Sequence, residues 1–280
     1  MEFLQLLPEK ERELVLKTLK PCLKLSFEAV NNLPLYASRL SGFGYLPKSI
    51  PYPRSRESNM PLSLLTQVNF AEMPRLEDFP EKGVLAFYFD GTDDLMGLNF
   101  ESPFSDNGYR VLYFPDHEEE GYSEEEQRAV FEEEELDEDS LLGPVFTKER
   151  PVKMTGRLEQ SHILTDCVEA AEIFGPNLYE YFSNLLGKDS QAFEDLSEAA
   201  LGSSQSHMIS GYPYFTQYDP RHGDPDKEFD TLLLQLDIDG DDNQEWGIMW
   251  GDAGVGNFFI NRERLKKLDF SRVLYNWDCC

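Results

Sequence analysis

The chain has 280 residues, and 53 Asp and Glu residues against 25 Lys and Arg residues give it a formal net charge of −28. With 40% hydrophobic residues it can bury enough apolar surface to fold, so we expect a single globular domain over 1–280. The charge opposes binding along a phosphate backbone, which excludes nucleic acid as the expected partner. No run of about 18 apolar residues could cross a bilayer. We therefore expect a cytoplasmic protein with no membrane partner.

Local patterns predict the first elements in chain order. Pro8 begins a segment with helical apolar spacing, which predicts a helix over 8–20. Three short apolar runs bounded by turn residues follow, and they predict strands at 62–70, 83–89 and 110–114. Further on, helical spacing over 166–186, interrupted by Gly175-Pro176, predicts two helical pieces.

Residues 116–139 form a strongly acidic segment, with fourteen acidic residues and one basic residue, Arg128. Ser123 and Glu126 have the spacing of a capping box, which predicts a helix through Phe131. Such a segment is either a solvated, self-repelling insertion or a binding tail. We expect it to be exposed and dispensable for folding.

Comparison of the chain with itself indicates a degenerate duplication. Four matches occur in the same order, at offsets of 169, 168, 171 and 162 residues: 41–45 with 210–214, 64–70 with 232–238, 83–89 with 254–260, and 110–113 with 272–275. They predict an α+β fold with two internally duplicated, mostly antiparallel β-rich halves, added helices and a pseudo-twofold axis. The first repeat spans 38–114 and the second 207–277. Residues 115–206 form an insertion with the acidic segment and helices.

The matching segments also carry a family resemblance. PLSLLTQVNFAEMP near Pro61, LLLQLDID near Leu232, WGDAGVGNFFI near Trp250 and the ending LDFSRVLYNWDC together resemble the bacterial YwqG-like family, a domain of unknown function. The resemblance extends from about Ser38 to Cys279, and WGDAG is its most specific part. It implies an α+β architecture, and it supplies no activity or catalytic residues.

Strand alternation predicts a candidate binding site. In 64–70, alternation places Leu64, Thr66, Val68 and Phe70 on one face of the strand and Leu65, Gln67 and Asn69 on the other. In 232–238, alternation places Gln235 and Asp237 together on one face in the same way. The two polar pairs then either tie down neighbouring loops or line a groove between the repeats, since a buried amide needs partners. The groove hypothesis comprises Gln67, Asn69, Gln235, Asp237, Trp250 and Asp252.

The sequence contains no motif for a cofactor, a metal or a nucleophile. Four cysteines without CxxC spacing predict neither a disulfide framework nor a zinc site. The glycine-rich run 251–256 lacks a following Lys and precedes an apparent strand, so it does not predict a phosphate loop. There is no HExxH spacing and no GxSxG elbow. We therefore expect no cofactor and no catalytic residues.

Three functions stay open on these observations. The leading one is a non-enzymatic intracellular protein that binds a basic protein partner through its acidic surface, in an immunity-like or inhibitory role. The first alternative is a small-molecule binding protein that uses the groove between the repeats. The second is an unrecognised hydrolase, since 53 acidic residues create many carboxylate pairs.

Overall fold

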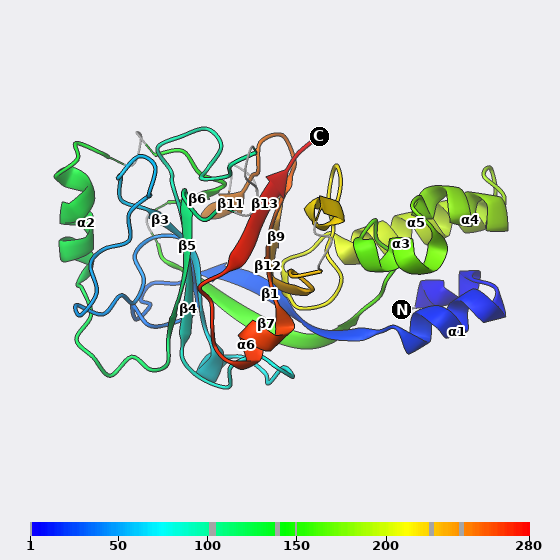
Figure 1. Ribbon diagram of the computed structural model, residues 1–280, viewed down its shortest axis with the longest axis horizontal. Coiled ribbons are helices and arrows are strands. Elements are labelled where there is room, and N and C mark those ends of the chain that lie inside the picture. The colour runs from blue at the N-terminus through cyan, green and yellow to red at the C-terminus, as the bar shows by residue number, and fades with distance from the viewer. Residues whose placement is uncertain (1, 101–104, 138–140, 149, 224–226, 241–243) are drawn as a thin grey trace.

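Ten antiparallel strands form the main sheet of the protein, as the computed structural model shows (Figure 1). The structure describes residues 2–100, 105–137, 141–148, 150–223, 227–240 and 244–280. In spatial order the strands are β13 (Val273–Asp278), β12 (Val255–Ile260), β9 (Thr231–Asp237), β8 (Met208–Ile209), β1 (Lys20–Ala29), β7 (Val152–Ser161), β2 (Arg39–Leu40), β3 (Ser63–Asn69), β4 (Val84–Phe89) and β5 (Tyr109–Phe114). A small second sheet contains β10 (Asp239–Gly240), β11 (Trp246–Ile248) and β6 (Val145–Thr147).

The centre of the large sheet is the pair formed by β1 and β7. These strands pair over ten residues, from Lys20 opposite Ser161 to Ala29 opposite Val152. On one side of them lies a first arm of β2, β3, β4 and β5, and on the other a second arm of β8, β9, β12 and β13. The residue pattern correctly predicted β3, β4 and β5 but indicated neither β1 nor β7. Besides the acidic segment and helices expected there, residues 115–206 also contain β6 and β7.

The main hydrophobic core lies between the two arms. Phe87 of β4 packs against Phe258 of β12 with ring centres 4.9 Å apart, and Tyr109 packs against Tyr275 at 5.2 Å. The Tyr109 hydroxyl also donates a hydrogen bond to the carbonyl oxygen of Val273 at 2.5 Å. The arms therefore pack face to face, and the two edge strands of the sheet meet through their side chains.

A β-bulge in each arm changes which side chains face this core. Leu65 has no opposite residue in the β3–β4 ladder, because Leu64 pairs with Tyr88 and Thr66 with Phe87. Leu233 of β9 likewise has no opposite residue in the ladder between β9 and β12. The predicted simple alternation is therefore wrong: Leu65 belongs to the main core, whereas Leu64 lies on the outer face with Gln67. An extra residue in one strand reverses the alternation beyond it.

Helices gather at both ends of the sheet (Figure 1). A helical lobe at one end contains η1 (Glu2–Leu6), α1 (Glu9–Lys17), α3 (Val168–Phe174), α4 (Leu178–Leu186) and α5 (Gln191–Ser204), whereas α2 (Glu124–Glu132) lies at the other end. The remaining short helices are η2 (Phe70–Glu72), η4 (Pro220–Gly223) and α6 (Arg262–Lys266). The predicted helix after Pro8 and the two pieces separated by Gly175-Pro176 are confirmed. Within the described residues, each helix is too short or too polar to span a membrane.

The acidic segment packs against the first arm through α2. Ser123 and Glu126 form the predicted capping box at the start of this helix. Phe131 is buried in a second core on the outer face of the first arm, and Gln127 is buried beside it. The backbone amide of Tyr122 donates to the carbonyl oxygen of Leu46 at 2.9 Å. The expectation of a wholly exposed segment is therefore wrong for α2; positions 138 and 139 lie outside the described residues.

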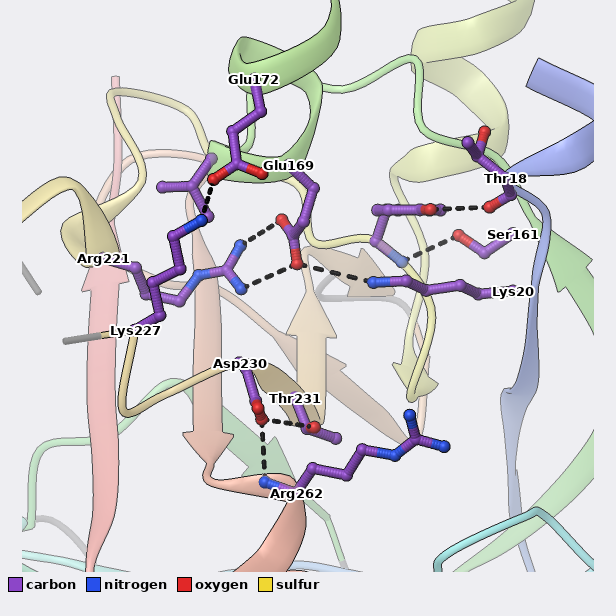
Figure 2. Close-up of polar contacts among 12 residues, drawn as sticks. Thr18, Lys20, Ser161, Glu169, Glu172, Arg221, Lys227, Asp230, Thr231 and Arg262 are labelled. Carbon is purple, nitrogen blue, oxygen red and sulfur yellow. Dashed lines mark hydrogen bonds and ion pairs between the residues drawn. The ribbon is translucent and has the colours of Figure 1, made fainter. Parts of the chain in front are cut away.

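A buried ionic cluster joins the helical lobe to the second arm (Figure 2). The Arg221 guanidinium donates to both carboxylate oxygens of Glu169 on α3, at 3.2 and 2.9 Å, and to Asp219 at 2.7 Å. It also lies 4.5 Å from the ring centre of Phe259 on β12. Lys20 of β1 lies 3.5 Å from Glu169. Burial alone would raise the pKa of Glu169, but Arg221 and Lys20 outweigh burial and hold the pKa at about 2.

The packing of α2 predicts the effect of truncating its buried aromatic side chain. Phe131→Ala should lower the free energy of unfolding by about 3 kcal/mol, because it removes a buried phenyl ring and leaves a cavity. The control is Phe100→Ala, since Phe100 is 65% exposed and should change stability by less than about 0.5 kcal/mol. Urea unfolding followed by circular dichroism measures both. Equal effects of the two variants would mean that α2 does not stabilise the fold.

The ionic cluster predicts acid sensitivity. The pKa of Glu169 is lower in the folded state than its ordinary value of 4.5, so its stabilisation is present above pH 4.5 and is lost as the pH falls toward 2. Glu169→Gln should remove about 3 kcal/mol at pH 7, and the difference from the wild type should shrink as the pH falls. Urea titrations at several pH values test this. A difference independent of pH would contradict the ionic role of Glu169.

Candidate binding cleft

A strained turn at residues 41 and 42 follows β2. Ser41 has φ of 55° and Gly42 has φ of 74°, both in the left-handed region that non-glycine residues rarely adopt. The buried Arg39 holds the surrounding loop, because its guanidinium donates to the carbonyl oxygens of Phe43, Leu33 and Pro34. Burial lowers the pKa of Arg39 to about 10, so its side chain stays charged at neutral pH.

Gln67 supports the same loop from β3. Its Oε1 accepts from the backbone amide of Tyr45 at 2.8 Å, and its Nε2 donates to the carbonyl oxygens of Leu35 and Ala37 at 2.8 and 2.9 Å. A Cβ at Gly44 would lie 2.5 Å from Gln67 Oε1, so this position requires glycine. The fully buried amide therefore fixes three backbone groups of the loop.

Gln235 makes the same kind of contacts from β9 in the second arm. Its Oε1 accepts from the backbone amide of Tyr214 at 2.7 Å, and its Nε2 donates to the carbonyl oxygens of Ser204 and Ser206 at 3.1 and 2.8 Å. These partners lie on either side of a turn in which Ser210 and Gly211 have φ of 63° and 90°. Gln235 thus fixes the loop that connects α5 to the second arm.

Asn69 and Asp237 lie two residues beyond the glutamines and differ in their bonding. Asn69 Nδ2 donates to the carbonyl oxygen of Tyr36 at 3.1 Å. Asp237 Oδ1 accepts from the Ile238 amide at 2.8 Å, and the Asp237 amide donates to His207 Nδ1 at 3.1 Å. Burial raises the pKa of Asp237 to about 6, although the Ile238 amide and His207 act to lower it. The Asp237 carboxyl therefore takes up a proton more readily than an ordinary aspartate.

The structure does not bring the two polar pairs together. β3 and β9 are separated by β2, β7, β1 and β8, on the order of 24 Å along the sheet at ~4.8 Å per strand. Apolar side chains fill the space between the arms. Trp250 is part of that core, stacked at 6.2 Å on Trp277, and Asp252 is exposed. The role of these six residues in binding stays a prediction.

A cleft of about 740 Å³ opens between the turn at Ser41 and Gly42, α2, and residues 141–148. Its walls combine apolar side chains with charges of both signs. The apolar lining includes Phe43, Tyr52, Leu64, Phe89, Phe131, Leu136, Leu141 and Leu142, and the charged lining includes Arg128, Glu132, Asp137 and Lys148. This volume is in the range of small-molecule and side-chain binding sites.

Contacts between α2 and the loop after β2 form one wall of this cleft. Gln127 Nε2 donates to the carbonyl oxygen of Gly44 at 2.9 Å. The Arg128 guanidinium lies 5.2 Å from the ring centre of Phe43 and 3.4 Å from Glu124. Because Gln67 fixes Tyr45 in the same loop, the buried glutamine of β3 indirectly positions the wall.

The surface around α2 is strongly negative. Lys48 is near two carboxylates, with Nζ 2.8 Å from both Glu120 and Glu126, and Arg54 lies 2.7 Å from Glu134. The exposed acidic residues of the segment are Asp116, Glu118, Glu119, Glu120, Glu124, Glu125, Glu126, Glu132, Glu133, Glu135 and Asp137. Carboxylates thus greatly outnumber the nearby cations, so this surface attracts positively charged groups.

The residues that build the cleft could not be predicted from the sequence. Arg39 and Gln127 are polar side chains whose burial depends on distant segments, so neither carried a local signal. Gly44 stands in the predicted first turn, and its close approach to Gln67 becomes visible only in three dimensions. Within the described residues, no group of three or more His, Cys, Asp or Glu side chains could hold a metal ion.

The fold is that of an α+β protein with a large antiparallel sheet and a cleft beside α2. Residues 38–279 match the family described as a domain of unknown function, DUF1963, and the chain belongs to that family. No curated protein matches the chain. The resemblance predicted an uncharacterised family over this range, and the match confirms it. The YwqG-like label stays a prediction.

The contacts of the two glutamines predict matched losses of stability. Gln67→Leu and Gln235→Leu should each lower the free energy of unfolding by about 1–3 kcal/mol, because buried backbone groups lose their partners. Gln160→Leu on β7 is the control, since Gln160 is exposed and its replacement should have little effect. Chemical unfolding measures all three. Variants of Gln67 and Gln235 as stable as the control would contradict the positioning role.

Proposed function

We propose that this protein is a non-enzymatic binding protein that engages a basic protein partner through the acidic surface of α2 and the adjoining cleft. The role would be inhibitory or immunity-like, in the cytoplasm. The observation that carries the proposal is the combination, at one end of the molecule, of exposed carboxylates and a cleft with apolar walls.

The rigidity of the acidic helix supports this proposal. The capping box, the burial of Phe131 and the Gln127 bond to Gly44 hold α2 against the first arm. A partner therefore meets carboxylates that are already ordered, which lowers the entropy cost of association relative to a disordered tail. Long-range attraction would chiefly raise the association rate.

The composition of the cleft supports a protein partner rather than a free ion. An apolar side chain of the partner can fill the space beside Phe43, Tyr52 and Phe131, while its basic residues face the carboxylates of the rim, Glu132 and Asp137. Binding surfaces commonly combine one buried apolar anchor with a charged rim.

We also propose that the two arms arose by internal duplication and are related by a pseudo-twofold axis. Three observations support this relation. The bulges fall at Leu65 and Leu233, 168 residues apart. The backbone partners of Gln67, at positions 35, 37 and 45, correspond to those of Gln235 at 204, 206 and 214, each 169 residues further on. Ser38 Oγ accepts a hydrogen bond from the backbone amide of Asn69, and His207 Nδ1 accepts the equivalent bond from the backbone amide of Asp237.

Strand pairing changes one of the four sequence matches. Tyr113 pairs with Leu85, whereas Tyr275 pairs with Phe258, the proposed counterpart of Phe87. When residues are counted along the two strand pairings, Tyr113 is the counterpart of Trp277. The sequence match of 110–113 with 272–275 had instead made Tyr275 its counterpart, so this match shifts by two residues. The proposed organisation is otherwise unchanged: one domain, with repeats at 38–114 and 207–277 separated by 115–206.

The proposed function predicts that binding depends on the negative charge of the acidic surface on and around α2. The variant Glu118→Gln, Glu125→Gln, Glu133→Gln removes three exposed charges and should weaken capture of a basic partner roughly tenfold. The control variant Glu180→Gln, Glu194→Gln, Glu198→Gln changes the net charge equally in the helical lobe. Pull-down from lysate at low and high ionic strength, with quantitative mass spectrometry, measures the difference.

The outcomes separate specific binding from general charge attraction. One basic protein should be captured by the wild type and the control variant, and lost with the α2 variant and at high ionic strength. Equal losses with both variants would mean that net charge alone is responsible. Capture that is unaffected by the α2 variant would contradict the proposed surface.

A further inference from the structure

A second cavity lies in the helical lobe, at the opposite end of the molecule from α2. Its volume is about 260 Å³. The residues around it come from α4, α5, the segment 164–166 and the segment 214–215, and they are mainly apolar. They are Leu164, Thr165, Asp166, Leu178, Tyr179, Phe182, Phe193, Leu196, Ser197, Ala200, Leu201, Ser204, Tyr214 and Phe215.

The β-sheet fixes two walls of this cavity. Gln235 accepts from the Tyr214 amide and donates to the Ser204 carbonyl oxygen. The carbonyl oxygen of Tyr214 accepts from Asn257 Nδ2 at 3.0 Å. Phe182, Phe193 and the other deep residues belong to the buried core of the lobe. The cavity is thus pre-formed and does not depend on a ligand for its shape.

The mouth of the cavity exposes two large apolar side chains. Tyr179 is 55% exposed and Leu201 is 46% exposed, so two large apolar side chains of the lining are in contact with water. Tyr179 is held in place by an edge contact with Phe193 at 5.1 Å. Covering these side chains with an apolar ligand would remove their surface from water, which is favourable.

One carboxylate stands at this mouth. Asp166 is exposed, and apart from the two tyrosines it is the one ionisable side chain among the described residues of the lining. Burial of part of the side chain raises the pKa of Asp166, and the backbone amide of Leu178 opposes this effect. In its ionised form the carboxylate places a negative charge beside an apolar space, where it favours a cation over an anion.

We propose that this cavity binds a small primary amine with an aromatic or short alkyl body, whose apolar part fills the lobe and whose ammonium group faces Asp166. The size fits such a ligand, since an apolar cavity of about 150 Å³ holds a benzene molecule. The exposed ring of Tyr179 offers a second favourable contact for the cation. This site is separate from the acidic surface of α2.

Three probe molecules with the same apolar body test the proposal. They are 2-phenylethylammonium, the neutral 2-phenylethanol and the anionic 3-phenylpropanoate, each titrated into the full chain at neutral pH and followed by calorimetry and by the midpoint of thermal unfolding. The ammonium should bind most tightly, the alcohol about two- to fivefold more weakly and the anion more weakly still. The midpoint should rise with ammonium concentration.

Two variants locate the binding. Ser197→Trp places a large side chain at the exposed rim and should abolish binding of all three probes, with Ser197→Ala as its control. Asp166→Asn should reduce ammonium affinity to that of the alcohol and leave alcohol binding unchanged. Asp189→Asn, an exposed aspartate of the lobe outside the cavity, should leave all affinities unchanged.

Each contrary result has a definite meaning. Absence of ammonium binding to the wild type at millimolar concentration overturns the proposal. So does equal binding by the wild type and the folded Ser197→Trp variant. If 3-phenylpropanoate binds as tightly as the ammonium, or if Asp166→Asn and Asp189→Asn have equal effects, the cavity is apolar only and the assignment to amines is wrong.

Discussion

The rest of the structure depends on the ten-residue ladder between β1 and β7. β8 pairs directly with β1 and β2 pairs directly with β7, so each arm is attached to one strand of this central pair. The same strands run on toward the helical lobe (Figure 1), where Lys20 meets the Arg221 and Glu169 cluster. One backbone ladder therefore sets the positions of both arms and of the lobe. The cleft and the second cavity lie at opposite ends of the molecule, and this ladder connects the parts that contain them.

The sequence predicted those elements whose side chains carry a local signal. β3, β4 and β5 are short apolar runs between turn residues, and α2 has its capping box, so their type could be read directly. β7 could not be predicted in this way. Beyond Met154 it contains Gly156, Arg157, Glu159 and Gln160, which are exposed or half-buried and weak strand formers. Its strand structure comes from pairing with β1, more than 120 residues away in the chain. The bulges at Leu65 and Leu233 likewise depend on partner strands and leave no trace in the hydrophobic pattern.

The site was predictable only in part, and for a physical reason. A glutamine between apolar residues of a strand indicates a buried amide with obligatory partners, and this holds for both Gln67 and Gln235. Their partners could not be deduced, because they are backbone groups of loops that have no distinctive composition. The sequence left open whether the two amides tie down loops or line one groove; in the structure both bond to loops, on the outer faces of opposite arms. Each amide supports a loop that contributes residues to the lining of a cavity.

The sequence separation across the central sheet also governs when the protein can fold. Lys24 of β1 lies beside Met208 of β8, although 184 residues separate them. During synthesis, β1 leaves the ribosome long before either of its neighbours exists, and its backbone groups stay unpaired until β7 and β8 have been made. Contacts of such long range slow folding and prolong the exposure of unpaired strand edges. The chain therefore completes the centre of its sheet late, and in that interval the unpaired edges of β1 are open to pairing with other molecules.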